Sequence, residues 1–186
     1  ALSRIGRQTF RAARPSEEMI DTLRDYKNGA EHSTMDKHEL GAIRELVESG
    51  DYMTEVPMSL YRGAGAGELG GPALVRAADA AEDSGDWSKL VGMEFTAPTP
   101  VDSWTHSVTI GRKFGEGFGS IDSPRRTVLI WDAPAGTKAI NLDTGMVDTE
   151  ELRESEWIPA STKWTITKAQ VYDSKEGARQ SLLELH

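Results

Sequence analysis

Apolar residues at helical spacing dominate the first fifty positions. A first stripe lies between Ser16, which suits a helix start, and Asn28-Gly29, which suits a helix stop. A second stripe lies between Thr34, a candidate N-cap, and Gly50. The two stripes consist of Met19, Ile20, Leu23 and Tyr26, and of Leu40, Ile43, Leu46 and Val47. Spacings of three and four residues predict two amphipathic helices that serve as scaffold.

Beyond residue 55 the pattern changes to short runs that are typical of strands. Strands are expected over residues 58–62, 92–96, 101–104, 125–131 and 139–142, from residue 154 onward, and over 163–172. Helices are expected over 73–83 and over 174–185. A further short helix, capped by Thr105 or Ser107, is expected to bury Ile110 and Phe114, which are four residues apart. This order lacks the regular strand–helix alternation of a parallel α/β protein.

Composition limits the classes of protein. A chain of 186 residues with 38% hydrophobic content predicts one globular domain, residues 1–186. The net charge of −9 argues against a nucleic-acid partner, and no apolar run approaches the roughly 20 residues of a membrane span. The chain has no Cys, and its four His residues show no metal-ligand spacing. We therefore expect no metal.

The first fourteen residues contain four arginines and no acid. Arg4, Arg7, Arg11 and Arg14 follow a 3-4-3 spacing, which would place them on one helical face. This segment suits either an acidic partner or a solvated helix face.

A glycine-rich run follows the strand expected at residues 58–62. Gly65-x-Gly67-x-x-Gly70 stands between this strand and the next helix, as in a dinucleotide-binding fingerprint. A Rossmann unit also needs a second parallel strand that ends in an acid about 20 residues later. The acids found there, Asp83 and Asp86, fall at a helix end beside Gly85. The run is therefore more typical of a flexible loop.

Two further positions carry candidate chemistry. Arg62 ends an apolar strand beside Gly63, a placement that suits a phosphate or carboxylate ligand as well as an ordinary surface arginine. Glu154 and Glu156 stand two apart at the start of a strand, so both project to one face, roughly 7 Å apart. Such a pair is either a solvated strand edge or a pair of carboxylates kept for catalysis.

Three constellations occur in a fixed order along the chain. Tyr61-Arg62-Gly63 is an aromatic-Arg-Gly at a strand end. Ser103 is followed by a small residue, Gly111, eight positions later and by Phe114 three positions after that. Glu154-Ser155-Glu156 enters a late strand. In this order the sequence resembles the ADP-ribosyltransferases of the arginine–serine–glutamate class, the clostridial-toxin-like branch that also occurs in phages and bacterial effectors.

The resemblance covers about residues 55–172 and departs from the family pattern in places. Ser103-Trp104-Thr105 replaces Ser-Thr-Ser, and Thr96 is a rival candidate for the serine position. The family usually has Ala where this chain has Gly111.

The resemblance implies an α+β fold. Two small, mainly antiparallel sheets would pack across an NAD cleft, with residues 1–50 as an N-terminal helical part and 55–172 as the catalytic core.

The resemblance also implies an activity, transfer of ADP-ribose from NAD to a protein side chain, arginine, with release of nicotinamide. Glu156 would stabilise the ribosyl cation, Glu154 would activate the incoming guanidine, and Ser103 would position Glu156. The expected NAD contacts are Arg62, Gly63, Ser103 and Thr105, with Phe114 or Phe118 stacking on nicotinamide.

The resemblance implies a protein acceptor in the cytoplasm of a host or target cell, reached by delivery from a phage or a secretion system. Three alternatives stay open. The chain could be an NAD glycohydrolase, a non-catalytic domain of the same fold that binds NAD or a partner, or a Rossmann oxidoreductase.

Overall fold

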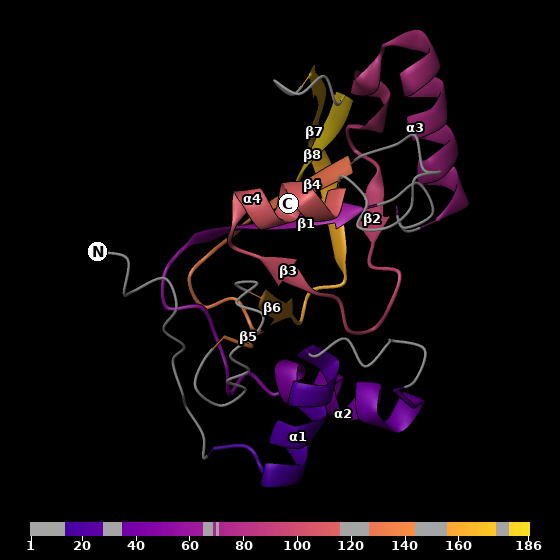
Figure 1. Cartoon of the computed structure of the whole chain (residues 1–186). Coiled ribbons are helices and arrows are strands. Elements are labelled where there is room, and N and C mark those ends of the chain that lie inside the picture. The colour runs from indigo at the N-terminus through magenta and orange to yellow at the C-terminus, as the bar shows by residue number, and fades with distance from the viewer. Residues whose placement is uncertain are drawn as a thin grey trace. The chain divides into compact units, whose positions relative to one another are not determined.

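A computed structural model describes residues 14–27, 35–64, 69, 71–115, 127–143, 156–173 and 179–186 (Figure 1). Contacts divide the chain into two compact units. The first comprises Ala1–Met58, Pro100–His106 and Ala133–Ser161, and the second comprises Ser59–Thr99, Ser107–Asp132 and Thr162–His186. Each unit is therefore assembled from three separate stretches of the chain.

The first unit contains two helices and three short strands. The helices are α1 (Glu17–Lys27) and α2 (Lys37–Glu48), and the strands are β3 (Trp104–Thr105), β5 (Ala139–Asn141) and β6 (Glu156–Pro159). β6 lies between β3 and β5 and is antiparallel to both. Both predicted N-terminal helices are confirmed.

The N-terminus of α2 differs from the prediction. Its N-cap is Asp36, two residues after Thr34, which lies outside the described residues. The Asp36 carboxylate accepts from the backbone amides of His38 and Glu39, while the Glu39 carboxylate accepts from the Asp36 amide. This reciprocal arrangement is a capping box, in which aspartate provides the side-chain acceptor.

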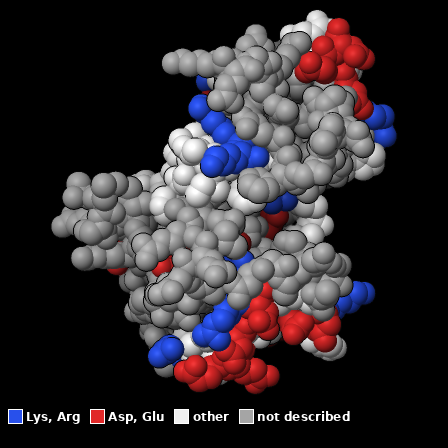
Figure 2. All heavy atoms as spheres, in the orientation of Figure 1, with Lys and Arg blue, Asp and Glu red and all other residues white. Residues whose placement is uncertain are grey.

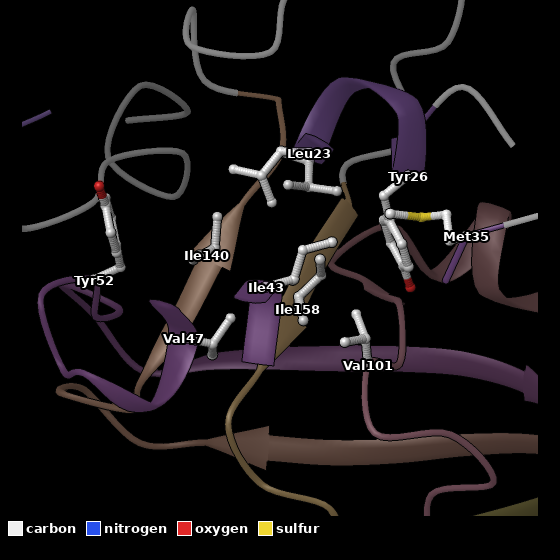
Figure 3. Close-up of a cluster of buried hydrophobic side chains, with 10 residues drawn as sticks. Leu23, Tyr26, Met35, Ile43, Val47, Tyr52, Val101, Ile140 and Ile158 are labelled. Atoms are coloured by element: carbon white, nitrogen blue, oxygen red, sulfur yellow. The ribbon is translucent and has the colours of Figure 1, made fainter. Parts of the chain in front are cut away.

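The core of the first unit lies between the helices and β5 and β6 (Figure 3). It contains Leu23, Tyr26, Met35, Ile43, Val47, Tyr52, Val101, Ile140, Leu142 and Ile158. The apolar stripes of both helices therefore pack on the sheet, as the amphipathic pattern predicts.

The second unit contains the longer strands. They are β1 (Met58–Ala64), β2 (Glu94–Thr96), β4 (Thr127–Ala133), β7 (Lys163–Asp173) and β8 (Arg179–Leu185), in the order β2-β7-β8-β4-β1. β2 and β8 are antiparallel to β7, whereas β4 and β8 are parallel. The helices are α3 (Pro72–Ser84) and α4 (Val108–Gly115), with a short 3-10 helix at Trp87–Leu90. The predicted α+β class with mainly antiparallel strands is confirmed.

Aromatic side chains fill part of the second core. Trp164 on β7 stands 5.6 Å from Phe95 and 5.4 Å from Trp131, measured between ring centroids. All three residues are buried. A bulge between Ile166 and Lys168 then shifts the register of β7 against β8. Lys168 is consequently exposed and does not continue the buried face of Trp164 and Ile166.

Two predictions for the second unit are wrong. The chain end expected to be a helix at 174–185 forms β8 over Arg179–Leu185. It pairs with β7, the strand directly before it, and with β4, which lies far away in the sequence. Phe114, expected on the buried side of its helix, is 41% exposed.

The position of β2, the strand that follows α3, bears on the Rossmann interpretation of the glycine-rich run. Gly65, Gly67 and Gly70 lie outside the described residues, but β2 is separated from β1 in the strand order by β7, β8 and β4. A Rossmann unit needs these two strands to be parallel neighbours, and they are not neighbours.

Candidate active site

Glu156 is a buried carboxylate in the first unit. It begins β6 and is only 8% exposed, although a charged side chain at a strand end is ordinarily solvated. Side chains alternate along a strand, so Glu156 shares a face with Ile158, which packs in the core beneath α1 and α2. Its neighbour Trp157 projects to the other face. A carboxylate in this place is costly unless hydrogen bonds compensate it.

Ser103 supplies one of these hydrogen bonds. It immediately precedes β3, and its hydroxyl donates to Glu156 Oε1 across 53 residues of sequence. The residues that follow Ser103 form β3. In the antiparallel ladder of β3 with β6, Thr105 pairs with Glu156 and Trp104 pairs with Trp157. The strand pairing therefore holds Ser103 and Glu156 in reach of each other.

Thr105 is the third candidate that the structure brings to this place. It is buried and lies directly opposite Glu156 in the β3–β6 ladder. Residues opposite each other in an antiparallel pair project to the same face, with Cβ atoms about 4.5–5.5 Å apart. Glu156, Ser103 and Thr105 thus form one cluster of polar groups on the helix-covered face of the sheet.

The last turn of α1 adds two polar side chains that sequence reasoning missed. The Tyr26 hydroxyl lies 2.8 Å from Ser103 Oγ. Lys27 Nζ donates to the backbone oxygen of Leu142 at 3.1 Å and to Asp143 Oδ1 at 2.9 Å. In the sequence, Tyr26 reads only as the end of an apolar stripe, and no local signal relates it to a serine 77 positions away.

Lys27 fixes the segment at Leu142 and Asp143, which directly follows β5. Its side chain is 3% exposed and that of Asp143 is 19% exposed. Removing one partner of a buried ion pair typically costs about 3–5 kcal/mol. The Leu142 amide in turn donates to the Glu156 backbone oxygen at 2.9 Å. The end of α1 therefore anchors two segments that contact Glu156: Tyr26 holds Ser103, and Lys27 holds Leu142 and Asp143.

His106, which directly follows β3, contacts the opposite face of β6 and was not predicted as a site residue. Trp157 Nε1 donates to His106 Nδ1 at 3.0 Å, and the two rings meet edge to face. His106 Nδ1 is therefore an acceptor, which places the proton of the neutral ring on Nε2. This contact orients the chain directly after Thr105.

The other predicted site residues belong to the second unit or fall outside the described residues. Arg62 and Gly63 belong to β1 in the second unit, where the strand continues beyond Arg62 to Ala64. Arg62 is half-buried and its Nε is shielded from solvent. Phe114 is on α4 in the same unit and exposes its ring. Glu154 and Phe118 fall outside the described residues.

Within the described ranges, no group of three or more His, Cys, Asp or Glu side chains could hold a metal ion. No helix in the same part of the chain has the length and apolar character that a membrane span requires.

Comparison with known proteins places this fold. No protein-family model matches the sequence, and no curated protein sequence matches it significantly. Among solved structures, Plx2a, an ADP-ribosyltransferase toxin from Paenibacillus larvae, is similar with a TM-score of 0.63 and 14% identity, over 91% of this chain and 85% of that one.

Two further structures are similar over comparable lengths. C3stau2 from S. aureus, solved with NAD, gives a TM-score of 0.59 and 12% identity, over 93% of this chain and 88% of that one. The Clostridium limosum C3 exoenzyme gives 0.58 and 15%, over 92% and 86% of the two chains. The chain therefore has the fold of the C3-like ADP-ribosyltransferase toxins.

Proposed function

We propose that this chain is a mono-ADP-ribosyltransferase that takes ADP-ribose from NAD and attaches it to an arginine side chain of a protein. The bond between nicotinamide and ribose breaks, and its electron pair leaves with nicotinamide. A new bond forms between the ribose carbon and a guanidine nitrogen, which gives up one proton. The observation that carries this proposal is the buried Glu156 carboxylate, held by the Ser103 hydroxyl.

Glu156 suits the first half of this reaction. Cleavage develops positive charge on the ribose, as in glycoside hydrolysis. A carboxylate that is already oriented stabilises this charge without reorganising during the reaction. Burial strengthens the interaction because little water screens it. The Ser103 hydroxyl occupies Oε1 and so fixes the direction in which Oε2 points.

Arg62 suits the NAD phosphates. Its guanidinium can donate two parallel hydrogen bonds to a phosphate, and its β1 strand gives it a rigid base. Gly63 leaves the adjoining backbone accessible, and Thr105 offers a hydroxyl beside Glu156. Either Phe114, whose ring is exposed, or Phe118 stacks on the nicotinamide ring. NAD enters as substrate and no metal takes part.

Glu154 suits the second half of the reaction. An arginine guanidinium carries its proton at all physiological pH values and has no free electron pair to attack carbon. A carboxylate beside it can bind the cation and accept the proton as a general base. Glu154 stands two residues before Glu156, the spacing that sends two strand side chains to one face. This glutamate is the argument for arginine as the acceptor.

The acceptor is a protein in the cytoplasm of a host or target cell, reached by delivery from a phage or a secretion system. Support comes from the neighbours in fold, of which Plx2a is named a toxin. The negative charge of α1 and α2 limits the kind of acceptor that can approach them. The exposed carboxylates of α1 and α2, seen in red in Figure 2, make that surface repel polyanions. A protein acceptor fits this charge better than a nucleic acid.

One experiment separates the candidate activities. The chain is incubated with NAD labelled in its adenylate part and with agmatine, a small guanidine acceptor. Nicotinamide release, label in agmatine and NADH formation are then measured together. We expect nicotinamide and labelled agmatine in equal amounts. Nicotinamide without labelled agmatine would identify a glycohydrolase, NADH would identify an oxidoreductase, and bound NAD without turnover would identify a binding domain.

A further inference from the structure

Tyr26 joins the scaffold of the first unit to its candidate catalytic carboxylate. The ring is 4% exposed and packs in the hydrophobic cluster between α1 and the sheet, which also contains Met35 (Figure 3). Only the hydroxyl leaves this apolar setting, and it lies 2.8 Å from Ser103 Oγ. An apolar stripe alone would be served equally well by phenylalanine. The hydroxyl therefore has a role that the core does not require.

The direction of this hydrogen bond follows from proton counting. An ionised carboxylate only accepts, and the Ser103 hydroxyl donates its single proton to Glu156 Oε1. Ser103 Oγ must then accept from its other neighbour. Tyr26 is consequently the donor, and the chain runs from Tyr26 through Ser103 to Glu156. Successive hydrogen bonds of this kind polarise and strengthen one another.

We propose that Tyr26 is a positioning residue for NAD cleavage, an inference that rests on the proposed function. Its hydroxyl keeps Ser103 in the single rotamer that donates to Glu156, and so sets the orientation of the carboxylate toward the ribose. The neighbouring Lys27 fixes the helix end that carries Tyr26, through its bonds to Leu142 and Asp143. Tyr26 acts through Ser103 and needs no contact with NAD for this role.

The expected effect is confined to the chemical step. Without the phenol hydroxyl, Ser103 Oγ loses a donor and turns among its rotamers, so the carboxylate is oriented for only part of the time. Loss of one hydrogen bond of this type corresponds to about tenfold in rate. Tyr26→Phe should therefore lower kcat for nicotinamide release about tenfold, while KM for NAD stays within about twofold.

The control is a second buried tyrosine of the same cluster. Tyr52 is 1% exposed, and Figure 3 shows it at the opposite side of the cluster from Tyr26. Tyr52→Phe removes the same atom from the same core. It should leave kcat within about twofold of wild type, because Tyr52 stands at the opposite side of the cluster from Tyr26 and distant sites act nearly independently.

The decisive experiment is a double-mutant cycle. Nicotinamide release is measured for Tyr26→Phe, Ser103→Ala and the double variant, with unfolding midpoints for each. If Tyr26 acts through Ser103, Tyr26→Phe has no further effect once Ser103 is alanine. A full additional tenfold loss in that background, or wild-type kcat in Tyr26→Phe, would overturn the inference.

Two remaining outcomes are also decisive. A Tyr26→Phe protein that does not fold would make the hydroxyl a structural group and would contradict a positioning role. A wild-type chain that releases no nicotinamide would overturn the proposed function and this inference together. Turnover by wild type with unchanged kcat in Tyr26→Phe would remove only the inference.

Discussion

Glu156 and Arg62 are charged residues that the structure places in confined surroundings. Glu156 is buried against Ser103, and Arg62 is half-buried on a strand. Confinement gives each charged group a fixed direction, which is what binding or catalysis requires of it. It also makes the shape of each side chain matter as well as its charge.

The role of Arg62 can be tested by keeping its charge. Arg62→Lys retains the cation but loses the planar fork that grips a phosphate with two bonds. We expect NAD affinity to fall about tenfold, in line with the loss of one charge-assisted hydrogen bond. Titration calorimetry with NAD measures this directly.

Arg76 provides the matched control for that measurement. It is an exposed arginine on α3 in the same unit, so Arg76→Lys should leave NAD affinity unchanged. Equal affinities for wild type and both variants, with folding intact, would remove Arg62 from the NAD site.

The sequence predicts some of these residues and misses others for a physical reason. The sequence indicates Glu156 and Ser103 because their spacing to Glu154 and Phe114 follows a known family pattern. It indicates Tyr26 only as a core residue, since nothing local distinguishes a tyrosine that packs from one that also donates a hydrogen bond. Its partner lies 77 residues away and reaches it only through the strand pairing of β3.

Some helices and strands are determined by the local sequence pattern, and others by pairing with distant parts of the chain. The start of α1 after Ser16 and the run of β4 depend on local pattern, and both were predicted. β8 was predicted as a helix, because Leu182, Leu183 and Leu185 suit either structure. Pairing with β4 and β7 decides in favour of a strand and buries the alternate residues Ser181, Leu183 and Leu185. Tertiary pairing of this kind overrides local propensity.

The capping box of α2 makes a testable contribution to stability. Hydrogen bonds from the backbone amides of Glu39 and His38 hold the pKa of Asp36 below its usual range. A carboxylate with a lowered folded-state pKa stabilises the fold above its unfolded value of about 3.9. That contribution disappears as the pH falls through the lowered value. Asp36→Ala should therefore reduce Tm at pH 7, with a difference that shrinks toward pH 3.

Asp36→Asn is the control for charge. Asparagine also caps helices well, so this variant should stay close to wild type at pH 7. It cannot titrate, and its stability relative to Asp36→Ala should not depend on pH. Thermal unfolding of the three proteins between pH 7 and pH 3 gives both comparisons. A pH-independent gap between wild type and Asp36→Ala would contradict the assigned role of the carboxylate.

The chain as a whole consists of two units, each with helices, strands and buried apolar residues of its own. The prediction of one domain over residues 1–186 stays a prediction. The first unit joins the N-terminal helices to β5 and β6, which come much later in the sequence. The ion pair of Lys27 with Asp143 spans 116 positions. Contacts at such separations are invisible to periodicity. They explain why the sequence indicated the elements of the candidate site better than the contacts that build it.

In the proposed reaction, Glu156 promotes the cleavage of NAD and Glu154 directs the ADP-ribose to arginine. The most direct measurement compares nicotinamide release and agmatine labelling in Glu156→Gln and Glu154→Gln. Glu55→Gln, an exposed glutamate of the first unit, serves as the control.

We predict that Glu156→Gln loses both activities by about 10²–10³-fold, because the fixed charge that meets the ribosyl cation is gone. Glu154→Gln should lose agmatine labelling by about 10²–10⁴-fold while it keeps much of the nicotinamide release. Equal loss of both activities in Glu154→Gln would remove its arginine-specific role. Near-wild-type nicotinamide release in Glu156→Gln, at the level of Glu55→Gln, would contradict the account.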